Sequence, residues 1–521
     1  MLRTHPQWQM RTAWLWLLVA TAFRVVYAGS FPLVPDETNY WQWGRHLALG
    51  YHDQAPLIGW SIRLATECFG QTEWAVRLPS VLAVAVASIY LVLAARRWYG
   101  PSAALATALL SQSILLINVG GLLATPDGLQ AAGWAGAAYH AARGYENDRW
   151  SDWLLAGAWF GLGILAKFTM VLFLMCAYAY GLWSADHRSR LARLRPYCGV
   201  ALGLLMFLPV IIWNAANDWN SVRHVAHIGG VDEQVLIRFR FIGDFLGSQA
   251  ALLSPVVFVL VVLAWSLTHP LSAGRSRWID RYLFFTSFPM VAFFGLLSLH
   301  SRVYGNWPGA GYLTVAVTVA AWFGCRDIEL PLKRVRWGRK LWPWAIATAY
   351  LMSAAVLLQA VRPFLPIPVR WDRTATEIRG WDRLGREAGR VRESMPDPQA
   401  AFLFGLSYQI ASELAFYTPG QPQTVSINKW GRPNVYDYWW QEADLLGKNA
   451  VGVTYDGTSH LNRLRQVFDR VDPPIAVPIY WPHEENATDR PPVKTYFIYR
   501  CFGFKGGLSW QPPDKNDVRV R

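Results

Sequence analysis

Long apolar runs recur along the first part of the chain, and they restrict its possible folds more than any other feature. Each run approaches the roughly 20 residues that an α-helix needs to cross the hydrocarbon core of a bilayer. The 521-residue chain is 53% hydrophobic and only 16% charged, whereas soluble domains carry about 25% charged residues. The sequence therefore predicts an α-helical, polytopic membrane protein, and its 29 Trp suit membrane interfaces.

We expect about eleven spans of this kind. They lie near residues 14–28, 79–95, 103–119, 129–142, 153–166, 168–183, 197–213, 249–267, 282–299, 308–324 and 341–361. The fifth and sixth runs are short, and together they predict a hairpin that need not cross the membrane fully twice.

Arginine and lysine residues occupy alternate loops, which predicts the orientation of the chain. With the N-terminus in the cytoplasm, every strongly basic loop faces inward: Arg96 and Arg97; Arg143 and Arg149; Arg188, Arg190, Arg193 and Arg195; Arg275, Arg277 and Arg281; and Lys333, Arg334, Arg336, Arg339 and Lys340. This agrees with the positive-inside rule. It assigns the net charge of +14 to membrane topology rather than to nucleic-acid binding. The segments predicted outside are 30–78, 118–128, 214–247, 300–307 and 362–521.

Residues 362–521 differ in composition from the preceding spans. They are polar and Pro-rich, with a predicted helix near Thr374–Glu393. Short β-type runs follow at Ala401–Phe404, Ala450–Thr454, Ile475–Tyr480 and Thr495–Tyr499. We therefore expect a membrane module over 1–361, with a large first outer loop at 30–78, followed by a small extracytoplasmic α/β domain over 362–521.

Three carboxylates from separate outer loops are expected on the same face of the membrane. Asp36 and Glu37 follow the first span, Asp53 lies further along that loop, and Asp127 begins the fourth span. A partly desolvated carboxylate at the membrane surface can act as a base. Asp36 after Pro35, and Asp127 after Pro126, are also placed as helix caps, so a structural interpretation stays open.

Basic side chains accompany these acids. Lys167 lies in the apolar hairpin, where an intramembrane charge indicates function, although a lysine that extends to the interface is the alternative. Arg302 and Asn306 lie in another outer loop. Cations at this level suit a phosphate-bearing lipid. His52 adjoins Asp53, and His224 and His227 are three residues apart. These histidines predict no defined metal site, and a divalent ion remains possible.

In order and sidedness these motifs resemble the bacterial integral-membrane glycosyltransferases of the protein O-mannosyltransferase and aminoarabinose–lipid A transferase superfamily (GT-C type). The matching segments are Asp36-Glu37, Gly50–Leu57, Ala75–Pro79, Thr125–Asp127, Gly161–Lys167, Trp213-Asn214 with Asp218-Trp219, Asn306–Pro308, and Gly431–Trp439. The likeness covers most of the chain.

The resemblance implies a sugar donor carried on a polyprenyl phosphate, an envelope lipid, glycan or protein as acceptor, and a periplasmic site in a bacterial inner membrane. It implies Asp36 as the catalytic carboxylate of an inverting transfer, with Glu37 positioning the loop and Asp127 as a second acidic group. It implies substrate binding by Arg45, His52, Asp53, Lys167, Arg302, Asn306 and Tyr436. The sequence makes no cofactor certain and leaves a divalent metal open, and nucleic acid is not an expected partner.

The chain also departs from the aminoarabinose branch. Asn39 stands where that branch usually has Arg, and Gln54 and Ala55 replace its residues before Pro56. The phosphate contacts of that branch are therefore not carried over. A transporter of lipid-linked sugars is an alternative, but we find no paired broken helices that indicate inverted repeats. A non-catalytic, glycan-binding assembly protein is another.

Overall fold

The chain divides into two compact units. The computed structural model describes residues 6–229, 237–272, 276–328, 332–455, 457, 460–480 and 492–509. Met1–Gly29 and Ala48–Leu357 form what we call the membrane unit, and Ser30–Leu47 and Leu358–Arg521 form the C-terminal unit. The division after Leu357 lies close to the boundary predicted at 361. The sequence predicts Ser30–Leu47 within the membrane module, whereas the structure groups it with the C-terminal unit. Arg275 and parts of the outer segments 214–247 and 362–521 lie outside the described residues.

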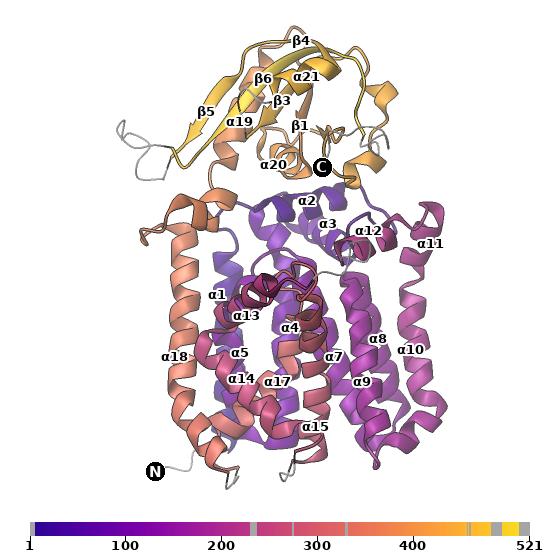
Figure 1. Ribbon diagram of the computed structural model, residues 1–521, viewed down its shortest axis with the longest axis vertical. Helices are drawn as coiled ribbons and strands as arrows, with labels where there is room; N and C mark the ends of the chain where they lie inside the picture. Colours follow the sequence, from indigo (N-terminus) through magenta and orange to yellow (C-terminus); the bar gives the residue numbers. More distant parts are fainter. Residues whose placement is uncertain are drawn as a thin grey trace. The chain divides into compact units, whose positions relative to one another are not determined.

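Helices make up the membrane unit (Figure 1). They are α1 (Pro6–Tyr27), α3 (Leu57–Phe69), α4 (Glu73–Tyr99), α5 (Pro101–Ser113), α6 (Leu115–Gly120), α7 (Pro126–Asn147), α8 (Trp150–Ala166), η1 (Phe168–Met170), α9 (Val171–Trp183), η2 (Arg188–Ala192), α10 (Leu194–Met206), α11 (Leu208–Ala216), α12 (Asn220–Ile228), α13 (Phe239–Leu253), α14 (Pro255–Thr268), α15 (Trp278–Phe285), α16 (Phe288–Leu297), α17 (Gly311–Val319), η3 (Ala320–Gly324) and α18 (Lys333–Val361), the last of which ends in the C-terminal unit.

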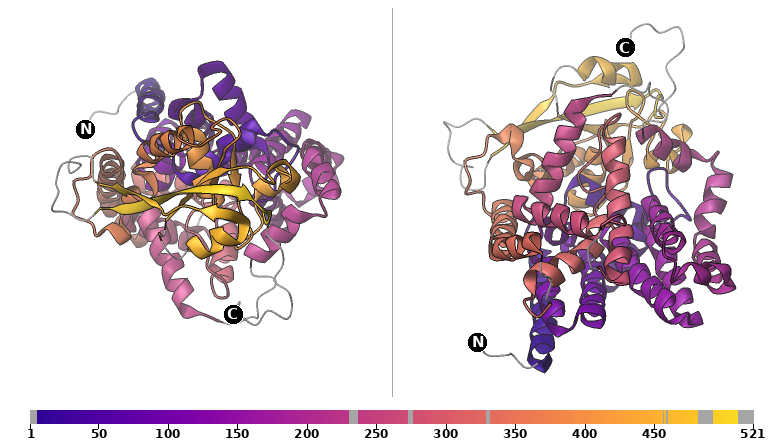
Figure 2. Two further views of the ribbon diagram at one scale, coloured as in Figure 1. Left: turned by 90° about the horizontal axis from the view of Figure 1, so that it is seen from above. Right: turned by 60° about the horizontal axis from the view of Figure 1, so that its bottom comes forward.

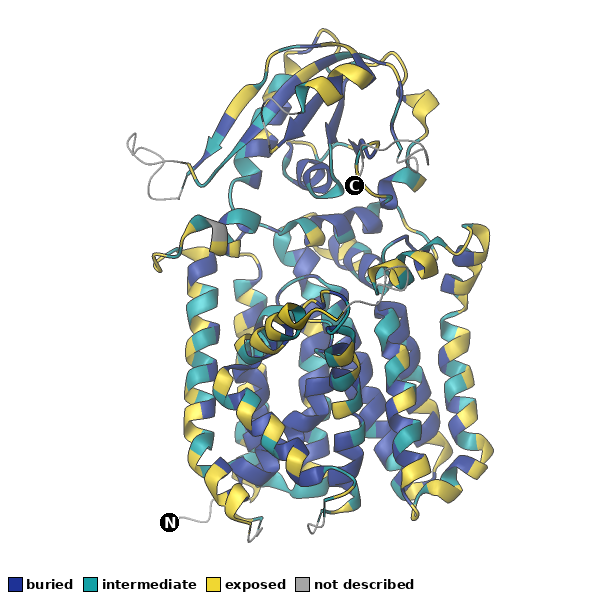
Figure 3. Ribbon diagram, viewed as in Figure 1, coloured by how far each residue is buried: buried dark blue, intermediate teal, exposed yellow. Residues whose placement is uncertain are grey.

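Two of the described helices, α4 and α18, are each long and apolar enough to cross a membrane. Two bent pairs also meet this criterion when each is taken together: α10 with α11, at 46°, and α13 with α14, at 105°. The polytopic helical class is confirmed, while the number of eleven spans stays a prediction. Figure 3 shows α4 more deeply buried than α18.

The sharpest break interrupts the single span predicted at 249–267. Ser254 adopts a left-handed backbone with φ of +74° between α13 and α14. Pro255 begins α14, and a proline disfavours the helical conformation of the residue before it. The Ser254 hydroxyl accepts a hydrogen bond from the Val257 amide at 3.4 Å. The chain therefore ends one helix and caps the next at this serine.

Small residues allow close helix packing around α8. A Cβ atom at Gly157 would overlap the carbonyl oxygen of Gly199 on α10, and one at Gly133 on α7 would lie 2.5 Å from the Cα atom of Gly163. Glycines permit such approaches between helices in membranes. The hairpin predicted from residues 153–183 is present as α8 and α9, joined at Lys167 and η1.

The C-terminal unit is an α/β domain that also contains α2 (Pro35–Arg45) from the first loop. Its other elements are η4 (Val369–Trp371), η5 (Thr374–Ile378), α19 (Trp381–Glu393), β1 (Phe402–Gly405), α20 (Tyr408–Tyr417), β2 (Thr424–Ser426), η6 (Val435–Tyr438), η7 (Glu442–Asp444), β3 (Ala450–Thr454), α21 (Leu461–Val467), β4 (Phe468–Val471), β5 (Ile475–Ile479) and β6 (Lys494–Phe504).

The strands form a mixed sheet in the order β2-β1-β3-β6-β4, and β5 also pairs with β6. The pairs β1–β2 and β1–β3 are parallel, and β6 is antiparallel to its three partners. Strand β6 is long because β4 and β5 pair with successive parts of it; it is the long yellow strand in Figures 1 and 2.

Side chains that alternate along the strands form a hydrophobic core on each face of the sheet. Leu403, Val451 and Ile498 pack with residues of α19 and α20, whereas their neighbours Phe404 and Tyr499 pack in a second core with α21. This follows from the two-residue period of a strand. The helix predicted over Thr374–Glu393 is interrupted at Gly380, whose φ is +83°.

Candidate functional site

Helix α2 carries Asp36 and Glu37 in its first turn. The helix begins at Pro35, as expected, but Val34 rather than Asp36 is the N-cap residue. The buried Glu37 carboxylate accepts a hydrogen bond from the Val34 amide at 2.9 Å, which satisfies one of the amides at this helix start. Asp36 is exposed, because the adjacent position points away from the core that buries Glu37.

The remainder of α2 makes hydrogen bonds and a ring contact with other elements of the C-terminal unit. The Thr38 hydroxyl lies 3.0 Å from the Ser412 hydroxyl of α20. The Gln42 amide donates to the Tyr436 hydroxyl at 3.3 Å, and the His46 ring stacks on Trp439 with 4.2 Å between ring centroids. The backbone direction at Asp36 is therefore set by the C-terminal unit.

The sequence analysis did not select Tyr408, which contacts Asp36, or Arg432, which lies over the Tyr408 ring. The Tyr408 hydroxyl donates to an Asp36 carboxylate oxygen at 3.5 Å, and the Arg432 guanidinium lies 5.7 Å from the centre of the Tyr408 ring. Arg432 belongs to the Gly431–Trp439 motif, which was the available sequence signal. Nothing in the sequence marks Tyr408, because its proximity depends on the packing of α20 against α2.

Arg45 and Tyr436 are engaged inside the C-terminal unit. The Arg45 guanidinium lies 4.8 Å from the centre of the Trp41 ring and donates to the Pro422 carbonyl at 3.3 Å. Burial lowers the pKa of Arg45, opposed by the Tyr436 hydroxyl. Burial raises the pKa of Tyr436 to about 12, and its side chain is only 2% exposed. These placements favour packing roles for both residues.

Asp127, Lys167 and Asn306 come together in the membrane unit. The Lys167 ammonium lies 2.8 Å from one Asp127 carboxylate oxygen, and the Asn306 amide donates to the other at 3.2 Å. The Lys167 side chain is 8% exposed and that of Asp127 is 23% exposed. Lys167 follows the last residue of α8 and turns toward Asp127 instead of extending to the surface. In a low dielectric such a pair interacts more strongly than it would in water.

Arg302 lies four residues before Asn306 on the segment that precedes α17. Its side chain is exposed, with the guanidinium 6.0 Å from the centre of the Tyr304 ring. After Lys167, Arg302 is thus a second cation of the membrane unit. No contact between Arg302 and Asp127 is found among the described residues.

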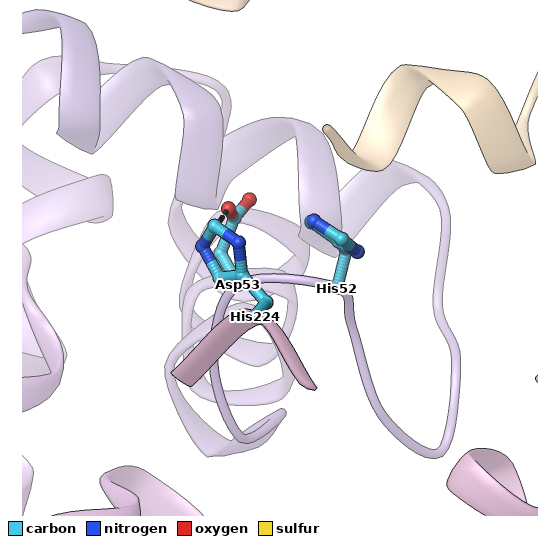
Figure 4. A group of neighbouring side chains, drawn as sticks. All are labelled: His52, Asp53 and His224. Atoms are coloured by element: carbon cyan, nitrogen blue, oxygen red, sulfur yellow. Dashed lines mark ion pairs between the residues drawn. The ribbon is translucent and has the colours of Figure 1, made fainter. Parts of the chain in front are cut away.

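His52 and Asp53 lie together on the segment before α3, also in the membrane unit. The structure adds His224 from α12 to them, as Figure 4 shows. The His224 Nε2 atom is 3.1 Å from an Asp53 carboxylate oxygen. His227, which shares a helix with His224, is exposed and is not in this group.

Comparison with known proteins finds proteins that are similar to this chain in sequence. Residues 53–213 match a family described as dolichyl-phosphate-mannose-protein mannosyltransferase. The lipid A galacturonosyltransferase RgtD of Rhizobium johnstonii is 28% identical over 331 residues, which are 60% of this chain and 65% of that protein. An undecaprenyl phosphate-α-4-amino-4-deoxy-L-arabinose arabinosyl transferase of Pseudomonas paraeruginosa is 31% identical over 317 residues. These are 55% of this chain and 53% of that protein, so the chain spans less than two thirds of either relative.

Solved structures share the fold. The apo structure of ArnT from Cupriavidus metallidurans aligns with a TM-score of 0.60 at 16% identity, covering 93% of this chain and 97% of that chain. An Archaeoglobus fulgidus oligosaccharyltransferase aligns with a TM-score of 0.53 at 13% identity, covering 86% of this chain and 69% of that one. The predicted likeness is therefore confirmed: the chain is similar in sequence to glycosyltransferases of this kind, and it shares the fold of ArnT.

Proposed function

We propose that this chain is an inverting glycosyltransferase that moves a sugar from a polyprenyl-phosphate donor to an acceptor of the bacterial envelope, on the periplasmic face of the inner membrane. The observation that carries the proposal is the contact of the Lys167 ammonium with Asp127 inside the membrane unit. The named activities of the sequence relatives support it, since one acts on lipid A and the other uses an undecaprenyl-phosphate donor.

The charge of the departing lipid phosphate explains why a buried lysine matters. A sugar–phosphate diester carries one negative charge, and breaking the bond between the sugar and the phosphate oxygen adds a second. A cation close to that phosphate therefore stabilises the transition state more than the ground state. Lys167 is the proposed cation; Asp127 accepts a hydrogen bond from its ammonium, and Asn306 in turn donates to Asp127. Arg302 is a second proposed cation for the phosphate.

Asp36 is the proposed base for the acceptor. As the acceptor oxygen forms its bond to the anomeric carbon, its proton passes to the Asp36 carboxylate, and the bond to the phosphate leaves with its electron pair. A single displacement of this kind inverts the anomeric centre. The exposed position of Asp36 in the first turn of α2 leaves its carboxylate accessible to an acceptor.

Glu37, Tyr408 and Arg432 would then support Asp36. Glu37 bonds the backbone at the start of α2, and the Tyr408 hydroxyl lies at the Asp36 carboxylate. We include Tyr408 because its hydrogen bond can fix the orientation of the carboxylate, and Arg432 because its guanidinium lies over the Tyr408 ring.

The test is sugar transfer by the purified full-length chain in proteoliposomes. Undecaprenyl-phosphate-linked aminoarabinose and galacturonic acid are supplied separately with lipid A, and each product is identified by mass analysis. We expect one donor to be consumed with an equal amount of glycosylated acceptor. Mass analysis of envelope lipids and glycans, with and without the protein in cells, identifies the natural acceptor if lipid A is not modified.

The same vesicles distinguish the transporter alternative. Movement of intact donor across the bilayer without product would contradict the proposed function. Unchanged envelope lipids, glycans and proteins in cells that lack the chain would contradict it as well.

A further inference from the structure

Three arginines converge on one buried aspartate where two loops of the membrane unit meet. Asp148 follows α7, and its side chain is only 3% exposed. The guanidiniums of Arg195 and Arg190 lie 2.7 Å and 3.5 Å from the Asp148 Oδ2 atom, and Arg193 contacts the same oxygen. These arginines belong to the loop between α9 and α10, at the lower ends of the two helices in Figure 1. The structure thus joins two basic loops that the sequence predicts on one side of the membrane.

The charges of this arginine cluster do not balance. Three guanidiniums on one carboxylate leave an excess of two positive charges. Glu146, two residues before Asp148, is engaged elsewhere, since its carboxylate lies 2.7 Å from the Arg97 guanidinium. Asp186 of the arginine loop is exposed, and no ion pair between it and the cluster is found among the described residues. Like charges held this close repel one another, so a further anion would stabilise the cluster.

The guanidiniums of the cluster keep N–H groups for another acceptor. Each guanidinium carries five N–H donors in a rigid plane. In the part of the chain that the structure describes, the side-chain hydrogen bonds of Arg193 and Arg195 use the Nη1 atom alone, and the buried Nε atom of Arg190 has no hydrogen-bond partner. The side chain of Arg193 is 49% exposed and that of Arg195 is 31% exposed. Such donors suit the oxygens of a phosphate, which arginine can bind through two parallel hydrogen bonds.

Exposed apolar side chains border the cluster. The Arg195 guanidinium lies 5.7 Å from the centre of the Trp150 ring, and Trp150 is exposed. Leu194 and Tyr197, at the start of α10, are exposed as well, and Figure 3 shows this end of the helix. Trp and Tyr favour the boundary between water and lipid. A phosphate on the arginines would therefore have an apolar surface beside it for the rest of a lipid molecule.

The loops that carry the cluster are held in place by other contacts. The Tyr197 hydroxyl donates to the carbonyl of the buried Leu191 at 2.8 Å. The Trp153 indole donates to the Asp148 Oδ1 atom at 3.3 Å, so it holds the carboxylate from the side opposite the arginines. The ordering cost of binding a ligand is low where the binding groups are already fixed.

We propose that Arg190, Arg193 and Arg195 bind the phosphate of an anionic phospholipid headgroup at this end of the membrane unit. Basic pockets between membrane helices bind such headgroups. A structural link between the two loops needs only one arginine on Asp148, and membrane orientation needs positive charge in the loop but not its convergence on one atom. The excess charge and the exposed guanidiniums therefore favour an anionic ligand. The inference does not rest on the proposed function, because a transporter with these loops would bind the same lipid.

The test is native mass spectrometry of the full-length chain, purified in detergent and titrated with phosphatidylglycerol or with zwitterionic phosphatidylcholine. We expect the wild type to bind phosphatidylglycerol in preference. Arg193→Gln should weaken this binding at least about 10-fold, the lower end for a lost hydrogen bond to a charged group. Arg336→Gln is the matched control, because it removes an exposed arginine from α18. It should cost less than about fivefold, the effect of one basic residue near a charged membrane surface.

Thermal stability supplies a second measurement, with Arg190→Gln as a second variant if Arg193→Gln folds poorly. Phosphatidylglycerol should raise the melting temperature of the wild type and of Arg336→Gln, because a ligand that binds the folded state stabilises it. The rise should be smaller in the two cluster variants. An equal rise with inorganic phosphate alone would overturn the assignment to a lipid. Equal affinity of the wild type and the cluster variants for phosphatidylglycerol, or no preference over phosphatidylcholine, would overturn the site itself.

Discussion

Lys167 is a charged side chain that is buried in the structure and that its position in the sequence had already marked. Its backbone lies between α8 and η1, and its ammonium contacts Asp127, which is 40 residues earlier in the chain. Removing one member of a buried ion pair leaves the other charge uncompensated and costs about 3–5 kcal/mol. The lysine is therefore constrained structurally as well as being the proposed partner of the donor phosphate.

We predict that Lys167→Met lowers kcat/KM for a lipid-linked donor by about 10²- to 10³-fold, the range for removing one transition-state donor. Lys333→Met is the control, because Lys333 is an exposed lysine of the same unit. Steady-state kinetics at several donor concentrations measure the effect. Wild-type kcat/KM for Lys167→Met, in protein that remains folded, would remove this lysine from the mechanism.

Lys494 gives a prediction for pH. Burial lowers the pKa of its ammonium from 10.5 to about 7, against the attraction of Glu413 and Glu377. The unfolded chain therefore binds more protons than the folded chain between pH 7 and pH 10.5, and the stability contribution rises with pH across this window.

Replacing Lys494 by Met should consequently raise the melting temperature more at about pH 6 than at about pH 9.5, since the cost of burying the charged lysine is present only at the lower pH. Scanning calorimetry of the solubilised protein measures the melting temperature at both pH values. Lys448→Met is the control, because Lys448 is exposed. An advantage of Lys494→Met that grows with pH would show that the sign is wrong.

At the scale of elements, α2 links the first loop to the C-terminal fold. Its helix start uses Glu37, and its later turns contact α20 and the Tyr436 region. These contacts join distant parts of the sequence: Thr38 and Ser412 are 374 residues apart in the chain. A local sequence pattern predicts the helix but not this partner.

We predict that Glu37→Ala destabilises the start of α2 by about 0.5–2 kcal/mol, whereas Glu37→Gln retains most of the stability because glutamine can make the same bond to the backbone. Activity should follow the same order if Glu37 acts by positioning Asp36. Melting temperature and transfer rate are compared in both variants. A stable Glu37→Gln protein without activity would instead assign the Glu37 carboxylate a chemical role.

At the scale of the whole molecule, the proposed orientation can be tested through a native cysteine. Cys68 is exposed near the end of α3, in a segment predicted outside, whereas Cys176, Cys325 and Cys501 are buried and Cys198 is partly exposed. A membrane-impermeant maleimide should therefore label intact spheroplasts through Cys68. Cys68→Ser should abolish most of the labelling. Labelling of the wild type only after lysis would place this loop in the cytoplasm.

Much of the architecture follows from the sequence because it depends on local or periodic signals. Hydropathy predicted the helical membrane class, and β-type runs located β3 exactly as Ala450–Thr454 and β5 to within one residue. Strand β2 was missed because it is only three residues long, and strand β4 because its two central residues are charged and exposed. The break at Ser254 was missed because its apolar surroundings continue on both sides.

The sequence predicted which types of residue form the candidate site, but not which of them lie in contact. The types and expected sidedness of Asp127, Lys167 and Asn306 marked them before their contacts were known, while Tyr408 and His224 depended on long-range packing. Asn306 is 179 residues from Asp127 in sequence, and Tyr408 is 372 from Asp36. Such juxtapositions arise from tertiary structure, and a single sequence carries no direct signal for them.

Sugar transfer by Asp36→Asn is the decisive measurement for the proposed mechanism. Purified wild type, Asp36→Asn and the control Asp382→Asn, which alters an exposed aspartate of the same unit, are given equal amounts of the lipid-linked donor that the wild type consumes. We predict normal transfer by the control. Asp36→Asn should be about 10²- to 10⁴-fold slower, as expected for loss of a general base. Transfer by Asp36→Asn at the wild-type rate would contradict the proposed mechanism.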